Sequence, residues 1–451
     1  MNELPSDLRL SEVLAALSCA LDLTEGQALG HAARTCLIGM RLAEELALSA
    51  ADRSALFYAL LLKDAGCSSN AARLSSLFQA DDQNVKQAHK LIDWTNTGEA
   101  LRFALTHTAP DASPLKRLTG IVSIGLNADE VGREMTATRC ERGADIARML
   151  GFPDLTALAI WNLDEHWDGS GHPIGLRGEE IPLVGRITCL AQTAAVFAHG
   201  LGVPAAYAVA RKRSGAWFDP ELVRALASFR DDAAFWTQVV SEEVRAHLKP
   251  HEPEDRVLLA DEAKLDAVAH AFARIVDAKS PFTFRHSERV AAIAARIGRE
   301  LGLPEPEVVD LRRAGLLHDI GKLGVSNRIL DKNGPLDDPE WSEMRKHPRF
   351  THEILLRVAR FRELAEVAAS HHERLDGRGY HRGLGADRLS LPSRALAVAD
   401  VVEALSAERP YRGSMPWGEV VGILETKRGT ALDPECLTIV MECGEAVLEP
   451  R

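Results

Sequence analysis

The sequence predicts an all-α protein built from two related helical domains. Apolar residues recur at three- and four-residue spacing along most of the chain, which is typical of helices with one buried face. Alternating patterns typical of strands are scarce, aromatic residues make up only 5%, and the helix formers alanine and leucine dominate. In addition, the two halves of the chain align with each other, which indicates one fold used twice.

The expected helices follow one another along the chain. The spacing predicts helices over Ser11–Leu23, His31–Leu46, Arg53–Leu62, Leu222–Val240, Val257–Val276, His286–Leu301, Glu305–Leu317 and Phe361–Ala369. The segment from Lys249 to Asp255 is polar and contains two prolines, which is typical of a linker. We therefore predict a first domain over residues 1–248, a linker over 249–256 and a second domain over 257–451. A chain of 451 residues is long enough for each domain to bury its own core.

The charge balance argues against a long nucleic acid as partner. Lys and Arg number 53 and Asp and Glu number 65, which gives a formal charge of −12. Proteins that bind polyanions usually carry a basic excess or a basic stripe, and this chain has neither. A small phosphate ligand held by a few arginines remains open.

Several features predict a cytoplasmic protein without a membrane anchor. The seven cysteines are scattered and form no CxxC motif, which suits a reducing compartment. The N-terminus MNELPSDLRL is acidic where a signal peptide would be basic. The longest strictly apolar run, Ala55–Leu62, is far shorter than the roughly 20 residues that cross a bilayer.

The internal repeat has two copies and one insertion. HAARTCLIGMRLAEELALS from His31 aligns with HSERVAAIAARIGRELGLP from His286, and LLLKDAG aligns with LLHDIG at the same offset. Further on, DEHWDGSGHPIGL around Asp168 aligns with HERLDGRGYHRGL around Asp376 at a smaller offset. The change of offset places one insertion between Asp64 and Arg139 in the first half. Such a repeat is far more specific than a short motif and indicates two homologous domains.

Candidate metal ligands concentrate in the second half. They are histidines and aspartates without cysteine: His286, His318, Asp319, His347, His371, His372 and Asp400. Such nitrogen and oxygen ligands suit iron or manganese, and also zinc, better than a soft thiolate-bound metal. Seven ligands are too many for one ion with an open position and about right for two.

A single helical histidine is more often a surface or core residue than a ligand, and one His-Asp pair is expected by chance. A comparison of the two repeat copies distinguishes a structural role of these residues from a functional one. The first copy has Lys63 at the position of His318, Arg139 at that of His347, Leu163 and Asp164 at those of His371 and His372, and Gln192 at that of Asp400. Constraints of the fold apply to both copies, so residues confined to one copy favour function.

The second half resembles an HD-GYP domain, the cyclic-dinucleotide phosphodiesterase branch of the HD superfamily of metal-dependent phosphohydrolases. The matching stretches are TFRHSERV (283–290), LLHDIGKLGVSNRIL (316–330), KHPRFTHEIL (346–355), HHERLDGRGY (371–380), VAD (398–400) and RPYR (409–412). The resemblance implies that the seven residues bind two divalent ions, with Asp319 bridging. It also implies that Lys322, Arg409 and Arg412 face substrate phosphate. Lys322 lies on the same helical face as His318 and Asp319 if that helix continues.

The sequence departs from the family pattern in places. His381 replaces the proline of the GYP signature, which leaves the partner contacts of this loop and the choice of dinucleotide open. Phe282 stands where some members have a glutamate that allows a third metal, so two metals are predicted. The first half looks like a degenerate copy that keeps His31 and Asp64. We expect it to cover an apolar face of the catalytic half, with a regulatory or ligand-sensing domain as the alternative.

These observations predict a phosphodiesterase with Asp319 and Lys322 as catalytic residues. The expected reaction is the hydrolysis of a cyclic dinucleotide to the linear dinucleotide by metal-activated water, and cyclic di-GMP is the substrate that the resemblance favours. A first alternative is the same chemistry on hybrid cyclic GMP-AMP, because the chain is a tandem with an altered GYP loop. A second is a non-enzymatic signalling module that keeps the metal site as a structural element. The sequence leaves a homodimer open.

Overall fold

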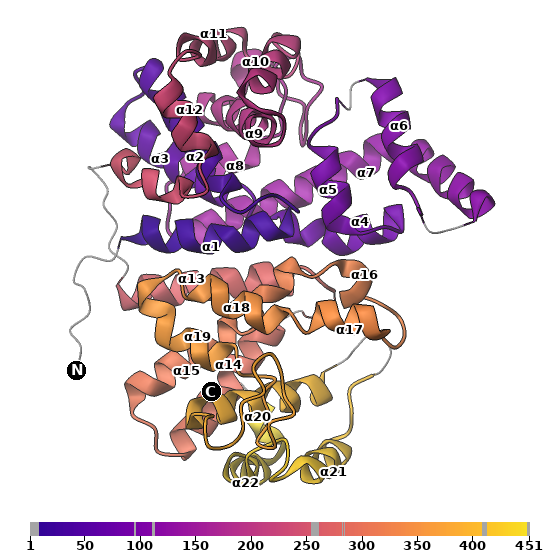
Figure 1. The fold of residues 1–451 in the computed structure, drawn as a ribbon, viewed down its shortest axis with the longest axis vertical. Helices are drawn as coiled ribbons and strands as arrows, with labels where there is room; N and C mark the ends of the chain where they lie inside the picture. The colour runs from indigo at the N-terminus through magenta and orange to yellow at the C-terminus, as the bar shows by residue number, and fades with distance from the viewer. Residues whose placement is uncertain are drawn as a thin grey trace. The chain divides into compact units, whose positions relative to one another are not determined.

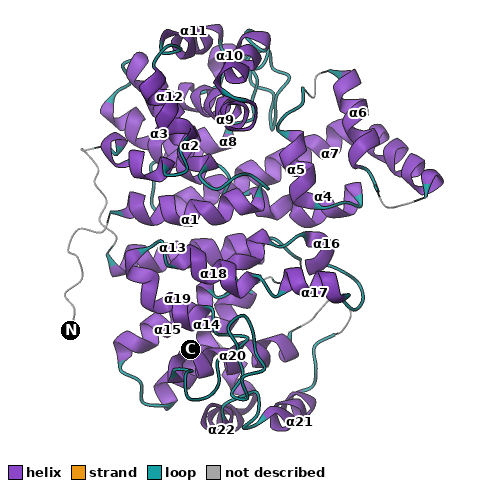
Figure 2. Cartoon of the chain, viewed as in Figure 1, coloured by secondary structure: helices purple, strands orange, loops and turns teal. Residues whose placement is uncertain are grey.

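The computed structural model describes residues 9–93, 96–110, 113–253, 261–281, 283, 285–407 and 413–448. Helices make up its regular structure, and within these ranges there is no strand beyond isolated bridges such as Asp376 with Gly385 (Figure 2). The predicted all-α fold is therefore confirmed. No helix among the described residues has both the length and the apolar character needed to span a membrane.

The described residues up to Asp261 form one compact unit, and those from Glu262 onward form another. The predicted domain bounds stay a prediction, and residues 254–256 of the expected linker lie outside the described residues. Before that point, residues 249–251 form a short 3₁₀ turn. Glu252 is buried and accepts a 2.7 Å hydrogen bond from Arg9 Nη1. The segment is therefore anchored to its own unit at this residue.

The first unit contains twelve described α-helices (Figure 1). They are α1 (Leu10–Thr24), α2 (His31–Glu45), α3 (Ala50–Leu62), α4 (Ala71–Phe78), α5 (Asp82–His89), α6 (Thr97–His107), α7 (Pro114–Met149), α8 (Asp154–Trp161), α9 (Leu183–Leu201), α10 (Val203–Lys212), α11 (Pro220–Ser228) and α12 (Ala233–Val240). Helix α2 packs against α3 and α9 and forms the centre of the unit.

The second unit contains ten described α-helices. They are α13 (Glu262–Asp277), α14 (His286–Glu300), α15 (Glu305–Leu317), α16 (Asn327–Leu330), α17 (Asp338–Met344), α18 (His347–Leu355), α19 (Arg362–Ala368), α20 (Leu391–Ser406), α21 (Trp417–Lys427) and α22 (Pro434–Cys443). Helix α14 packs against α15 and α20, which repeats the arrangement of α2 with α3 and α9.

Two buried features recur at aligned positions of both units. The carboxylate of Asp22 accepts hydrogen bonds from the backbone at the start of α2, and that of Asp277 does the same at the start of α14. A Cβ on Gly66 would meet the carbonyl oxygen of Arg139 at 1.9 Å, and one on Gly321 would meet that of His347 at 2.0 Å. Only glycine permits this close approach of the backbones, so both repeats are built around it.

The insertion in the first repeat forms a small core of its own. It spans α4, α5, α6 and the first part of α7, which contact one another (Figure 1). Phe78, Ala80, Val85 and Phe103 are buried together there. The insertion is thus a local addition that leaves the packing of α2, α3 and α9 intact.

One predicted helix is wrong in its extent. The segment Leu222–Val240 forms two helices, α11 and α12, rather than one. The carboxylate of Asp232 accepts a 3.0 Å hydrogen bond from the backbone N–H of Phe235 and thereby starts a new helix. Periodicity alone did not separate the two pieces, because both bury apolar residues at helical spacing. The expected helix Val257–Val276 is described from Glu262, and residues 257–260 lie outside the described residues.

Candidate metal centre

The seven predicted ligands come together in the second unit. His286 and His347 are the first residues of α14 and α18, and Asp400 lies within α20. His318 and Asp319 follow the end of α15, and His371 and His372 follow α19. All are buried except His372, which is half-buried. Helix ends provide most of the ligands, so the packing of α14, α15, α18 and α19 sets the geometry of the site.

The first ligand group contains His286, His318 and Asp400. Nε2 of His286 lies 3.5 Å from Oδ1 of Asp400, and Nε2 of His318 lies 3.8 Å from the same oxygen. Both nitrogens also face Oδ2 of Asp319, at 3.5 and 3.3 Å. Two imidazoles and two carboxylates therefore point to one position.

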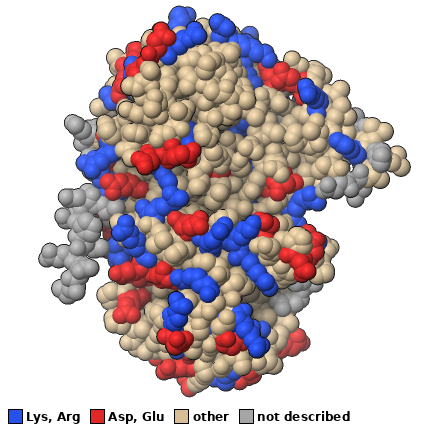
Figure 3. Space-filling view, in the orientation of Figure 1, with Lys and Arg blue, Asp and Glu red and all other residues tan. Residues whose placement is uncertain are grey.

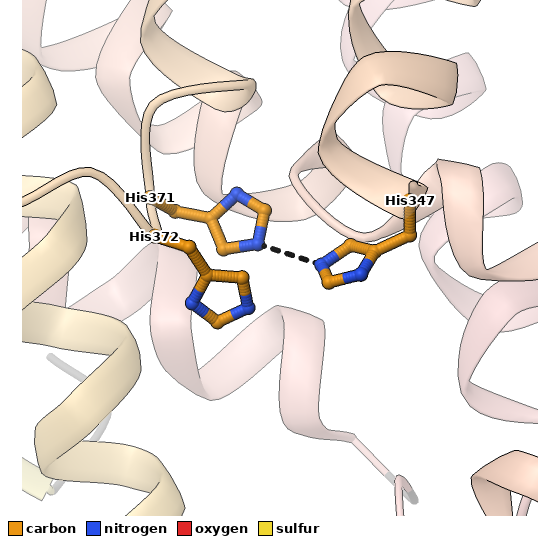
Figure 4. A group of neighbouring side chains, drawn as sticks. All are labelled: His347, His371 and His372. Atoms are coloured by element: carbon orange, nitrogen blue, oxygen red, sulfur yellow. Dashed lines mark hydrogen bonds between the residues drawn. The ribbon is translucent and has the colours of Figure 1, made fainter. Parts of the chain in front are cut away.

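The second ligand group contains His347, His371 and His372, whose rings gather at one point (Figure 4). Nε2 of His347 lies 3.1 Å from Nε2 of His371. Oδ1 of Asp319 faces these nitrogens at 3.4 and 3.6 Å. Asp319 therefore directs one oxygen to each group, which is the geometry of a bridging ligand.

Three ligand histidines have their tautomer fixed by a backbone carbonyl. Nδ1 of His318, His347 and His371 lies 2.7, 2.7 and 2.6 Å from the carbonyl oxygen of the residue three positions earlier. A carbonyl oxygen can only accept, so each Nδ1 must carry the proton. The lone pair of each Nε2 then points into the site, where it can bind metal.

The site fits a metal centre on its own geometry. Two Nε2 lone pairs, from His347 and His371, face each other at 3.1 Å with no proton between them, and a shared cation would satisfy both. Nε2 of His318 and Oδ1 of Asp319 are buried without a hydrogen-bond partner. Such orphaned polar atoms are costly unless a ligand binds them. The nitrogen and oxygen donors match the preferences of iron and manganese.

Electrostatics favour the metal-binding forms of His347, His372 and Asp319, but not that of His286. Burial lowers the pKa of both His347 and His372 to about 3, so these imidazoles are neutral. Burial would raise the pKa of Asp319, but His318 and Lys322 hold it well below its usual range. Burial would lower the pKa of His286, but the carboxylates of Asp319, Asp400 and Glu403 raise it well above its usual value. The same carboxylates would attract a metal cation.

Lys322 lies beside the ligands, although the helix does not continue as expected. Helix α15 ends at Leu317, and a 3₁₀ helix follows over Ile320–Gly324. Three residues make one turn of a 3₁₀ helix, so positions i and i+3 lie above each other. Nζ of Lys322 accordingly donates a 2.6 Å hydrogen bond to Oδ2 of Asp319. The side chain is about one-fifth exposed, and Arg409, Arg412 and Phe282 lie outside the described residues.

The GYP loop is held by hydrogen bonds to a buried glutamate, and not by a proline at the third position of the signature. Glu373 accepts hydrogen bonds from the backbone N–H groups of Arg382 and Leu384, at 2.7 and 2.9 Å. In the first repeat, the aligned Glu165 holds the corresponding loop in the same manner. The replacement of proline by His381 is therefore compatible with an ordered loop.

The first repeat has ion pairs where the second has metal ligands. Nζ of Lys63 lies 3.0 Å from Nε2 of His31 and also contacts the carboxylate of Asp64. Arg139 forms an ion pair with Asp164. These residues align with His318, His286, Asp319, His347 and His372, so the cations of Lys63 and Arg139 stand at the positions of two predicted ligands, His318 and His347. Gln192, at the position of Asp400, donates a 3.5 Å hydrogen bond to the backbone of Leu163.

Glu403 is a buried residue of the site that was not predicted from the sequence. It lies one helical turn after Asp400 on α20, is buried, and contacts Nδ1 of His286. The signal that could have revealed it is the repeat, because Ala195 stands at the aligned position of the first copy.

Comparison with known proteins identifies the class. A family model described as HD domain matches residues 126–222 and 270–436, in both halves of the chain. The chain belongs to the HD domain family. Its motifs place it in the HD-GYP branch, as the sequence resemblance implied.

Particular relatives narrow this class. The chain is 43% identical to "3'3'-cGAMP-specific phosphodiesterase 3" of Vibrio cholerae, over 95% of this chain and 93% of that protein. It is 36% identical over 39% of its length to "Cyclic di-GMP phosphodiesterase response regulator RpfG" of Xanthomonas campestris, covering 47% of that protein. A crystal structure of the cyclic GMP-AMP specific phosphodiesterase V-cGAP3 of V. cholerae matches with a TM-score of 0.66 and 38% identity, over 96% of this chain and 97% of the other.

Proposed function

We propose that this chain hydrolyses 3',3'-cyclic GMP-AMP to the linear dinucleotide. The broader class is firm: the chain is a cyclic-dinucleotide phosphodiesterase. The observation that supports this choice of substrate is the share of the chain that each relative matches. One relative named for cyclic GMP-AMP matches 95% of the chain, including the first repeat, and two others match 47% and 39%, whereas the relatives named for cyclic di-GMP match 39% or less. The alternative substrate expected from the sequence is therefore favoured over cyclic di-GMP.

Two divalent ions, iron or manganese, are proposed as cofactors. His286, His318 and Asp400 would hold one, His347, His371 and His372 would hold the other, and Asp319 would contact both. Bound there, the ions would supply a water of lowered pKa and Lewis-acid stabilisation of the phosphate oxygens.

The protein's own groups position the reaction. The carbonyl-bound histidines keep their Nε2 atoms directed inward, and the half-buried His372 and the partly exposed Lys322 stand where substrate can enter. The Lys322 ammonium can neutralise charge on a nonbridging phosphate oxygen as water adds to phosphorus. One P–O bond of the ring then breaks, and the leaving ribose oxygen takes a proton to give the linear product.

Product analysis with both nucleotides tests this function. Manganese- or iron-loaded protein is incubated with cyclic GMP-AMP and with cyclic di-GMP, and the products are separated by chromatography. We expect faster conversion of cyclic GMP-AMP, and none by an Asp319→Asn control. Faster conversion of cyclic di-GMP would overturn the substrate assignment. Failure to convert either nucleotide with the metal sites filled would favour a non-enzymatic signalling module.

Acidic and basic side chains are interspersed on the face of the molecule in Figure 3. We propose a small dinucleotide as the ligand, in keeping with the net charge of −12. All seven cysteines are free thiols, which suits a reducing compartment. The cytoplasmic location and a homodimer stay predictions.

A further inference from the structure

Glu403 connects a metal-ligand histidine to an arginine at the edge of the site. Its carboxylate is buried, with one oxygen on Nδ1 of His286. The other oxygen accepts a 2.7 Å hydrogen bond from Nε of Arg289, whose side chain is 41% exposed. Arg289, Glu403 and His286 thus form a chain of contacts that ends at the first ligand group.

A comparison of the two repeats shows which of these three contacting residues occur in both copies and which occur in one. Arg289 aligns with Arg34, which donates a 2.9 Å hydrogen bond to the backbone carbonyl of Leu29, so an arginine at this position belongs to both copies. Glu403 aligns with Ala195. The glutamate is therefore confined to the copy that has the ligand set, which is the pattern expected of a functional residue rather than of a fold constraint.

We propose that Glu403 is a positioning residue that orients His286 and strengthens it as a metal ligand. The inference rests on the proposed metal centre. By accepting a hydrogen bond from Nδ1–H, the carboxylate leaves the Nε2 lone pair directed at Asp319 and Asp400, where Nε2 lies 3.5 Å from an oxygen of each. A carboxylate behind a ligand histidine also raises its basicity toward the metal.

The proposal predicts an asymmetry between the two ions. Nδ1 of His318, His347 and His371 is bonded to neutral backbone carbonyls, whereas Nδ1 of His286 contacts a carboxylate. Loss of the Glu403 charge should weaken the ion held by His286, His318 and Asp400. The ion held by His347, His371 and His372 should keep its affinity.

Manganese titration of the full-length protein tests the proposal, with free Mn²⁺ followed by electron paramagnetic resonance. The variants are Glu403→Gln, Glu403→Ala and, as a matched control, Glu419→Gln at an exposed position of α21. Circular dichroism checks that each variant is folded. We expect Glu403→Gln to weaken one of two ions by about 10–100-fold. Excess manganese should restore much of its turnover, and Glu419→Gln should match the wild type.

The glutamine variant distinguishes the effect of the Glu403 charge from that of its size and hydrogen bonding. Glutamine can still accept a hydrogen bond from Nδ1, but it carries no charge, so a purely structural role would be rescued by it. Wild-type affinity for both ions in Glu403→Gln would overturn the proposal, even if Glu403→Ala binds poorly. Equal weakening of both ions would also overturn it. A wild-type protein that binds no manganese, iron or other divalent ion would instead refute the metal centre itself.

Discussion

Asp319 joins the two ligand groups because its two oxygens face different histidines. Oδ2 is 3.3 Å from Nε2 of His318, and Oδ1 is 3.4 Å from Nε2 of His347. Asp400 also faces both groups, with Oδ1 3.5 Å from Nε2 of His286 and Oδ2 3.8 Å from Nδ1 of His372, but Asp319 lies closer to each group. The replacement of Asp319 should therefore affect both ions, whereas the replacement of a single histidine should affect one group first.

Replacement of Asp319 by alanine should remove both metal ions and abolish hydrolysis. The bridging carboxylate is lost, and the remaining groups are mostly neutral imidazoles. Elemental analysis of the purified full-length chain should show about two ions in the wild type and far fewer in Asp319→Ala, with His318→Ala retaining at most one. Two ions in the Asp319→Ala variant would contradict a bridging role.

Replacement of Lys322 by alanine should slow turnover without emptying the metal sites. A protonated lysine has no lone pair for metal, but its charge can stabilise the transition state. Loss of one such contact typically costs about 10²–10³ in rate, so kcat should fall more than KM rises. Steady-state kinetics on cyclic GMP-AMP, with metal content measured in parallel and Lys427→Ala as control, checks this. An unchanged kcat would show that Lys322 does not stabilise the transition state and serves only as a hydrogen-bond donor to Asp319.

At the scale of elements, helical periodicity predicted the positions of the main helices well. The expected helix over Glu305–Leu317 coincides with α15, and that over His286–Leu301 ends one residue later than α14. What periodicity could not show are features that depend on distant contacts. These include the break before Asp232, the 3₁₀ turn that brings Lys322 to Asp319, and the contact of Glu403 with His286. The seven candidate ligands could be predicted as one set because the first repeat lacks most of them.

Helix α3 of the first unit ends in a buried ion pair, and breaking it should destabilise the protein. Lys63 and Asp64 are 1% and 3% exposed, and Lys90 lies 3.6 Å from Asp64. Removal of one partner of a buried pair typically costs about 3–5 kcal/mol. We expect Lys63→Met to lower the free energy of unfolding in urea by less than this amount, because Lys90 remains beside Asp64, while metal content and activity at low temperature stay unchanged.

The matched variant Lys63→Met with Asp64→Leu removes both charges and should recover much of that stability, because no buried charge is left uncompensated. Lys212→Met, at an exposed position of α10, serves as control. A loss of metal or of activity in folded Lys63→Met would show that the first repeat contributes to the active site.

At the scale of the whole molecule, the chain combines one unit with a metal-ligand set and one whose aligned positions carry ion pairs. Relatives match across both units, so the first repeat is part of the enzyme rather than an addition to it. Its expected role, to cover an apolar face or to sense a ligand, stays a prediction.

The ion pairs of the first repeat have a consequence for a cell short of metal. The positive charges of Lys63 and Arg139 are covalently part of the first unit. This unit should therefore fold whether or not iron or manganese is supplied. The other unit would depend on the environment for its positive charge. Metal depletion in the cell should therefore leave a protein that is folded but catalytically inactive. Its activity should return when metal is restored, without synthesis of new protein. In calorimetry, chelation should lower the melting temperature of one transition and spare the other, and equal shifts of both would contradict this division.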